Sequence, residues 1–189
     1  MQNDYLESVI KQFQYYRMLG EKAIDQLEPE HLFVSANEDT NSIATIVKHL
    51  WGNMLSRWTD FLTTDGEKPW RDRDAEFEND LKDKEEVMKK WNEGWDCLMN
   101  ALTSLKPEQL SHIIYIRNEG HTVLEAINRQ LAHYPYHIGQ IVYAAKMLKK
   151  GEWNSLSIPK NRSKQYNAVK FAKEKERKHF TDDEIKKLE

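Results

Sequence analysis

Residues 130–148, QLAHYPYHIGQIVYAAKML, decide the fold, because they read as the centre of a long helix in spite of an internal proline. Thr122 and Glu125 have the spacing of a capping box, which predicts the start of this helix. Apolar residues recur at helical spacing on both sides of Pro135. A proline inside a helix removes one backbone hydrogen bond and bends the helix without ending it. We therefore expect one bent helix over about 122–149.

Three other segments show apolar residues at the same helical spacing. They cover about residues 4–27, 41–63 and 83–105, and each is followed by a proline or by an Asp-Gly turn signal. No strand-rich region competes with them. The pattern predicts an all-α protein, an up-down four-helix bundle.

A short β-branched run, HIIYI at 112–116, precedes the turn sequence RNEG. β-branched residues favour strands, so we expect one short strand here, paired with HLFV at 31–34. Two short strands would not change the fold class. Between the second and third helices, residues 65–86 are strongly charged, and the part through Asn79 is a loop long enough to suggest a function.

The end of the chain differs in charge from the rest. From Lys160 onward, ten Lys and Arg stand against six Asp and Glu, so this part carries +4; the formal net charge of −3 then leaves −7 for residues 1–159. Because acids are mixed into the basic stretch, a solvated tail fits better than a nucleic-acid-binding one. We expect one bundle domain over 1–160 and a charged, partly helical C-terminal extension over 161–189.

The chain has no apolar run of about 18 residues and no N-terminal signal pattern, so neither a membrane-spanning helix nor a secretory leader is expected. Its single cysteine, Cys97, excludes an internal disulfide and fits a reducing compartment. Cys97 lies among large apolar residues, which favours a small core residue over a reactive thiol. These observations predict a cytoplasmic protein with no membrane or nucleic-acid partner.

His133 and His137 are four residues apart, which places them on one face of the predicted helix. At about 100° per residue they share a stripe of small and polar residues, whereas the apolar residues cluster on the far side. The members of this stripe are Ala126, Arg129, Gln130, Gln140 and Ala144. Such a mixture fits the wall of a cavity better than a dry core.

The second predicted helix carries a matching stripe around His49. Its members are Ser42, Thr45, Gly52, Asn53, Ser56 and Asp60. A free surface stripe would be expected to carry lysine and glutamate. The small neutral groups around His49 therefore indicate a face that is turned inward, towards something polar.

The three histidines together form a facial set of nitrogen ligands that leaves positions open for water or substrate, as in catalytic metal sites. Imidazoles suit Zn²⁺, Ni²⁺, Fe²⁺ or Co²⁺, whereas Ca²⁺ and Mg²⁺ prefer oxygen ligands. The HxxxH spacing alone is weak evidence, because such a pair is often structural or incidental. The stripe around His49 is the observation that favours a metal.

Two motifs resemble a known family. SIATIVKHLWGN at 42–53 and INRQLAHYPYHIGQI at 127–141 resemble the DinB-like (YfiT-like) superfamily of metal-dependent enzymes. The longer stretches GNMLSRWTDFLTTDGEKPWRDRDAEF and HTVLEAINRQLAHYPYHIGQIVYAAKM look like one of its functionally uncharacterised bacterial branches. The likeness covers about residues 3–170, and the motifs are specific as a set.

The resemblance implies a four-helix bundle in which His49, His133 and His137 hold one divalent metal, usually described as zinc or nickel, with water completing its shell. Members with known activity are thiol-dependent. They are transferases that join bacillithiol, mycothiol or glutathione to electrophiles, or isomerases that use such thiols. Homodimers are common. Pro135 departs from the small residue that is more usual at its position.

We therefore expect a metal-dependent thiol S-transferase, or a related hydrolase, that acts on a small molecule; the sequence singles out no catalytic residue. Asn53 and Gln140 are candidates to orient the imidazoles. The candidates to bind carboxylates of a low-molecular-weight thiol are Arg57, Arg71, Arg73 and Arg129. The alternative for these arginines is a surface role, paired with the neighbouring acids Asp72, Asp74 and Glu76.

Two other classes of function are weighed against the enzyme. The first is a non-enzymatic metal-binding stress-response domain, whose metal is structural or adventitious. The second is a nucleic-acid-associated protein, for which the sequence offers neither a basic face nor a recognition helix. Elemental analysis and thiol-conjugation assays separate the enzyme from the metal-binding domain.

Overall fold

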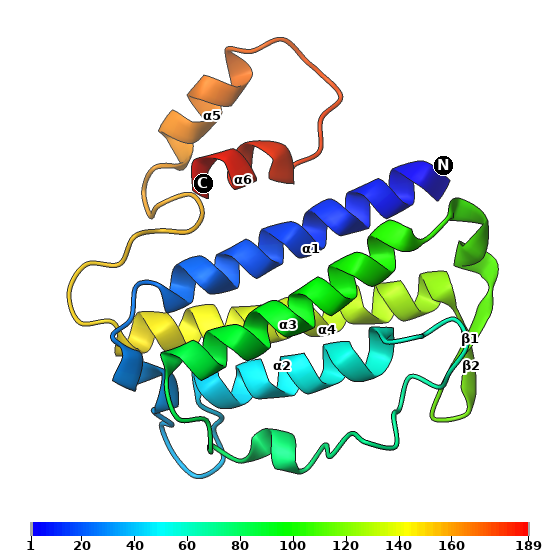
Figure 1. The fold of residues 1–189 in the computed structure, drawn as a ribbon. Coiled ribbons are helices and arrows are strands. Elements are labelled where there is room, and N and C mark those ends of the chain that lie inside the picture. Colours follow the sequence, from blue (N-terminus) through cyan, green and yellow to red (C-terminus); the bar gives the residue numbers. More distant parts are fainter. Residues whose placement is uncertain (1, 189) are drawn as a thin grey trace.

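The computed structural model describes residues 2–188. Four long helices form a bundle, with a β-hairpin at one end and two smaller helices outside it (Figure 1). The helices are α1 (Gln2–Ile24), α2 (Ile43–Trp58), α3 (Lys84–Ser104), α4 (Val123–Leu148), α5 (Ser163–Phe171) and α6 (Thr181–Leu188), and the strands are β1 (Ile113–Ile116) and β2 (Glu119–Thr122). Short 3-10 helices cover Pro29–Phe33, Ala75–Phe77 and Pro107–Ser111. The predicted all-α class is confirmed.

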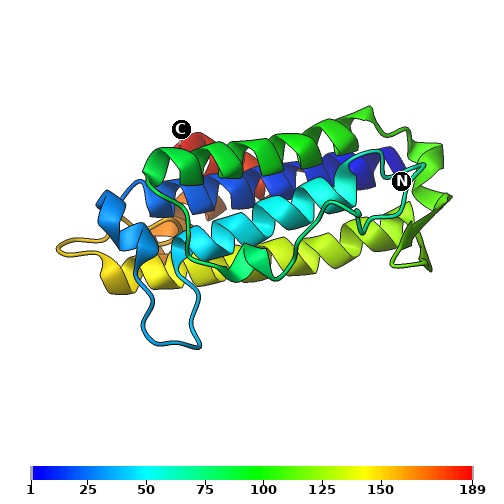
Figure 2. The ribbon, with the colours of Figure 1, turned by 60° about the horizontal axis from the view of Figure 1, so that its bottom comes forward.

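The long helices run up, down, down and up. Tyr5 of α1 donates a hydrogen bond of 2.6 Å to Asn128 of α4 near one end of the bundle. Gln26, just after α1, bonds Asn154, just after α4, near the other end, so these two helices are parallel. α2 and α3 are also parallel and run the opposite way (Figure 1). The connection over 59–83 therefore returns along the whole bundle, across α2 and α4 (Figure 2).

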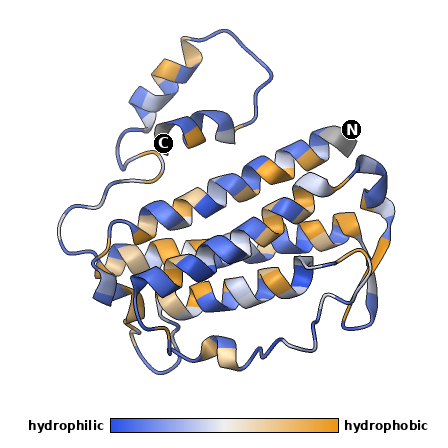
Figure 3. Ribbon diagram, in the orientation of Figure 1, coloured by the Kyte–Doolittle hydropathy of each residue, from blue (hydrophilic) through white to orange (hydrophobic). Residues whose placement is uncertain are grey.

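The core of the bundle is rich in aromatic side chains. Phe13, Trp91, Trp95 and Tyr134 are all fully buried, and their ring centroids lie 5.5–6.0 Å from the next ring along. Hydrophobic residues concentrate on the long helices, whereas the long connections are largely hydrophilic (Figure 3). These large rings add to the apolar surface that folding removes from water, the main favourable contribution to a fold.

The helix boundaries follow from capping and backbone geometry. The Thr122 hydroxyl accepts from the amide of Glu125, and the Glu125 carboxylate accepts in return from Thr122, so the predicted capping box begins α4. Pro135 lies inside this single helix, as predicted, and the bend at Pro135 stays a prediction. α2 ends at Trp58, five residues before the predicted end, because Thr59 is extended, with a ψ of 122°, and Asp60 after it takes a left-handed conformation with a φ of 47°.

The predicted strand at 112–116 exists, but its predicted partner was wrong. Residues 31–34 belong to a 3-10 helix and its cap, and β1 pairs instead with β2, directly after it. Arg117 and Asn118 form the two-residue turn, with φ values of 57° and 61°, as in a type I′ hairpin. Asp65 accepts hydrogen bonds from both of their amides, at 2.8 and 2.9 Å, which stabilises the turn.

The C-terminal segment lies outside the bundle. α6 packs along α1 (Figure 1), where His179 bonds Ser8 at 3.0 Å and Lys11 pairs with Asp182. α5 buries none of its residues. The division at residue 160 stays a prediction, and its outer limits, residues 1 and 189, lie outside the described residues. Within 2–188, every helix is too short or too polar to span a membrane.

Candidate metal centre

Three histidines meet between α2 and α4. The Nε2 atom of His133 lies 3.3 Å from Nε2 of His49 and 3.0 Å from Nε2 of His137. One ring nitrogen from each of the three lies within 4.8 Å of the others. The structure therefore brings together the three residues that helical spacing selected.

The packing of Tyr134 sets the direction of the two histidines on α4. Its fully buried phenol accepts a hydrogen bond of 3.0 Å from Trp58 and donates one of 3.1 Å to Asn53, both on α2. These bonds fix the rotation of α4 against α2, so that His133 and His137 face His49. Among the described residues, Asn53 bonds no histidine, so it acts on the histidines through Tyr134 and not directly.

The other nitrogen of each ring is held by an oxygen. The Nδ1 atoms of His49, His133 and His137 lie 2.9, 3.1 and 2.8 Å from side-chain oxygens. These oxygens belong to Glu76, Gln130 and Gln140 respectively, the last of which was predicted to orient an imidazole. An oxygen acceptor fixes the proton on Nδ1 and leaves the lone pair on Nε2. All three lone pairs then point into the space between the rings.

Three converging lone pairs repel one another unless a cation lies between them. When two nitrogens bind the same transition-metal ion at about 2.1 Å, with an N–metal–N angle between about 90° and 109°, they lie about 3.0–3.4 Å apart. The separations of Nε2 of His133 from Nε2 of His137 and of His49, 3.0 and 3.3 Å, fall in this range. The donor set therefore fits a divalent transition metal.

Glu76 holds His49 in place, a role that the sequence did not predict. It lies in the 3-10 helix Ala75–Phe77 of the crossover connection, and only 3% of it is exposed. Its carboxylate accepts from His49 and, through both oxygens, from Arg71 at 2.7 and 3.0 Å. From the sequence, Glu76 was expected only as a surface partner in the alternative role of the arginines. Only the length and charge of the connection hinted at a role for the loop.

Burial and hydrogen bonding set the protonation of this cluster. Burial, reinforced by the neighbouring histidines, lowers the pKa of His133 to about 3, and burial also lowers the pKa of His137. Burial alone would raise the pKa of Glu76, but hydrogen bonds from His49 and Arg71 outweigh it and lower that pKa. At neutral pH, His133 and His137 are therefore neutral, the form that binds metals.

A cleft of about 380 Å³ opens beside the histidines. Its lining includes the three histidines, the side chain of Phe77 and five arginines, namely Arg57, Arg71, Arg73, Arg117 and Arg129. Four of these arginines were predicted as binding candidates, and Arg117 was not. The volume suits a small organic molecule.

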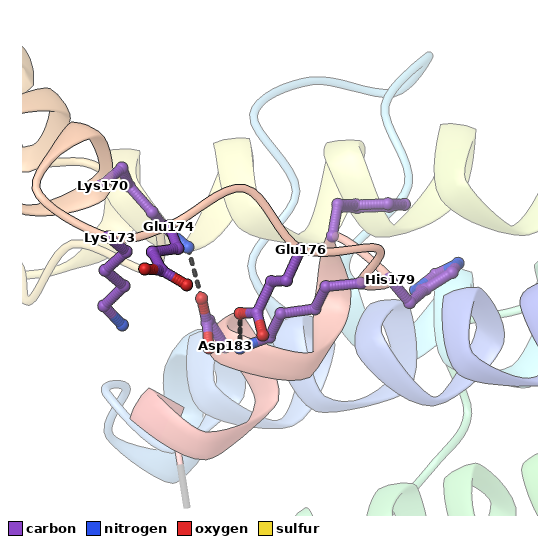
Figure 4. Close-up of a pocket in the computed structure, with 8 residues that line it drawn as sticks. Lys170, Lys173, Glu174, Glu176, His179 and Asp183 are labelled. Atoms are coloured by element: carbon purple, nitrogen blue, oxygen red, sulfur yellow. Dashed lines mark hydrogen bonds and ion pairs between the residues drawn. The ribbon is translucent and has the colours of Figure 1, made fainter.

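A second hollow, in the C-terminal segment, has a different character. It is lined by lysines and acids of α5, α6 and their connection (Figure 4). Its lining holds three lysines and three acids, and Lys170 and Lys178 both pair with Asp183, so the opposite charges balance over the hollow as a whole. His179, at its edge, bonds Ser8 and Thr181, and each of its ring nitrogens has a protein partner. The His49 cluster is thus the better candidate site.

The fold and the cluster define a helical-bundle protein with three histidines placed to hold a metal ion. A family model described as "Protein of unknown function (DUF1572)" matches residues 1–162, and the chain belongs to this family. No curated protein and no solved structure matches the chain. α5 and α6 lie beyond the matched residues.

Proposed function

We propose that the protein is a metal-dependent enzyme of the DinB-like superfamily, in which His49, His133 and His137 hold one divalent transition metal, zinc or nickel. The single observation that carries this proposal is the convergence of three Nε2 atoms whose rings are each held by an oxygen at Nδ1. The motifs at 42–53 and 127–141, which supply these histidines, support the superfamily assignment.

The reaction that we propose is a thiol S-transfer to a small electrophile, or a related hydrolysis. When bound, the metal supplies a positive charge that favours thiolate over thiol, or hydroxide over water. Glu76 fixes the ring of His49 and makes it a better donor, as carboxylates do behind metal-bound histidines. The arginines of the cleft position the anionic part of the thiol or substrate.

The test combines metal analysis with a thiol assay on the purified full-length chain. We expect a bound transition metal, and metal-dependent consumption of a low-molecular-weight thiol when a bimane or chloronitrobenzene electrophile is present. The His49→Ala, His133→Ala and His137→Ala variants should lose both. If the parent holds no metal and these variants have the same melting temperature as the parent, the proposal of a metal centre is wrong.

A non-enzymatic metal-binding role is the second candidate. The lining of the cleft, as far as the structure describes it, offers arginine, histidine and amide groups but no carboxylate, hydroxyl or thiol. An enzyme would have to draw its general acid or base from the histidine cluster itself or from the substrate. A chain that binds metal but neither consumes thiol nor hydrolyses esters fits this second role.

We also propose that the chain forms a homodimer. The outer face of α4 exposes Tyr136, Tyr143 and Met147, each more than 60% accessible. Large apolar side chains in one row are typical of a protein interface. Light scattering after size exclusion tests this, and Tyr143→Glu should convert a dimer to a monomer. A parent that is monomeric at high concentration contradicts it.

A further inference from the structure

The charges around the cleft are strongly unbalanced. Five arginines line it and no acid does. Behind them, Glu67 pairs with Arg57, Arg71 and Arg117 at 3.2, 3.4 and 3.0 Å. Glu76 pairs with Arg71. Two carboxylates thus pair with three of the guanidinium groups, and the arginines of the cleft outnumber the acids that pair with them.

Two of the arginines are free to bind a ligand. Within residues 2–188, neither Arg73 nor Arg129 has an ion-pair partner, although Arg73 lies 5.1 Å from the ring centre of Phe77. Both line the cleft, and Arg129 lies on α4, one turn before His133. A guanidinium group donates through a planar fork that matches a carboxylate or a phosphate.

Arg57 provides independent evidence of an incomplete site. Its side chain is 94% buried, and its Nε atom is buried without a hydrogen-bond partner. Its Nη1 atom donates to the carbonyl of Gly66 and to the carboxylate of Glu67. Burial, followed by the nearby charge of Arg71, lowers the pKa of Arg57, and the pairing with Glu67 only partly offsets this. A buried cation with an unmet donor is stabilised by an anion in the adjoining cleft.

We propose that this cleft binds the doubly negative oxyanionic part of a small molecule, either two carboxylates or one phosphate, and holds it beside the histidine cluster. This inference rests on the proposed function, because it names the chemical class of the substrate of that same site. The occupant is a small molecule and not a polymer, because the cleft holds only about 380 Å³.

The experiment is a calorimetric titration of the full-length chain at low ionic strength and pH 7.5, both as purified and after treatment with a chelator. The probes are malonate, inorganic phosphate and malonamide, a neutral molecule with the shape of malonate. We expect saturable binding of at least one dianion to both preparations, and no binding of malonamide. Tighter binding of malonate identifies a dicarboxylate ligand, and tighter binding of phosphate identifies a phosphate ester.

The variants distinguish binding by these particular arginines from a general effect of net charge on affinity. The double variant Arg73→Gln with Arg129→Gln should weaken binding of the dianion at least about tenfold, since each lost pair removes a charge-assisted hydrogen bond. The double variant Arg162→Gln with Lys164→Gln, which removes the same two charges at exposed positions around the start of α5, should leave the affinity unchanged. Melting followed by circular dichroism checks that each variant is folded.

Three results overturn the proposal: neither dianion binds, the double variant binds like the parent, or binding is lost when the metal is removed. The last result would assign the anion to the metal and not to the arginines. These results differ from the one that would contradict the proposed metal-dependent function. A chain that binds malonate through its arginines but holds no metal contradicts the metal centre alone.

Discussion

The cleft between α2 and α4 and the C-terminal segment are both rich in charge, but they use it in opposite ways. In the C-terminal segment, three lysines line the hollow together with three acids, Asp183 pairs with two of these lysines, and the charges balance (Figure 4). In the cleft, Arg57 and Arg71 are almost entirely buried and positive charge is in excess. Charged runs in the sequence therefore do not locate a site. Charges that are buried and not neutralised indicate a site.

Glu76→Gln is expected to have the largest effect on the cleft. The amide can still accept from His49, but it loses the negative charge that strengthens this ring as a donor and that binds Arg71. Metal affinity should fall about 10–100-fold, the usual effect of removing a partner behind a metal-bound histidine. Glu78→Gln, an exposed change in the same connection, is the control and should leave the affinity unchanged. Competition with a chromogenic chelator measures both.

Gly52→Ala tests how tightly the buried carboxylate is held. A Cβ at Gly52 would lie 2.2 Å from Oε1 of Glu76, which is fixed by Arg71 and His49 and cannot move away freely. We expect a loss of about 1–3 kcal/mol in the free energy of unfolding, typical of overpacking, together with weaker metal binding.

The matched control for this change is Gly139→Ala on α4. A Cβ there meets nothing within 4 Å, so the higher helix propensity of alanine should stabilise the chain by about 0.5–1 kcal/mol. Chemical denaturation measures both variants. Equal effects of the two substitutions would contradict the packing of Glu76 against α2.

The reactivity of the Cys97 thiol tests whether the bundle protects its side chains from solvent while the C-terminal segment does not. Burial raises the pKa of its thiol above the usual value, an effect that the hydrogen bond with Thr59 only partly offsets. A raised pKa leaves less thiolate at pH 8, so iodoacetamide should react more slowly with the folded chain than with the chain in denaturant. The rate should climb as the pH rises beyond 9. Ser163→Cys in a Cys97→Ala background, on exposed α5, should react at the denatured rate.

Asp183→Asn should have the smallest effect. It removes both lysine pairs of the C-terminal segment, but these half-buried pairs lie outside the core of the bundle and remain partly accessible to water, which limits what they contribute to stability. The thermal midpoint of the bundle and its metal affinity should stay unchanged, whereas trypsin should cut the connection between α5 and α6 faster. A fall in metal affinity would show that the two regions are coupled.

The sequence predicted the long helices and the histidine cluster because both depend on local periodicity. Thr122 began α4 as expected, and the stripes of small residues placed His49 opposite His133 and His137. The spacing of residues along one helix is fixed by its geometry, so no tertiary information was needed.

The sequence did not predict what depends on how distant segments pack. Glu76 reaches His49 only because the crossover connection runs back along the bundle, which no helical period reveals. The pairing of β1 was assigned to a distant segment, although Arg117 and Asn118 could supply a two-residue turn nearby. Asn and Gly are the usual residues of such a turn, so an arginine at its first position hid the hairpin.

The central claim is that the three histidines between α2 and α4 bind a metal ion and that the histidine of the C-terminal segment does not. Elemental analysis after equilibrium dialysis against zinc or nickel tests it most directly. The parent and His179→Ala should each hold one divalent ion per chain, whereas His133→Ala, still folded by circular dichroism, should hold none above background. A metal-free parent, or a His133→Ala variant as fully loaded as the parent, would contradict the claim.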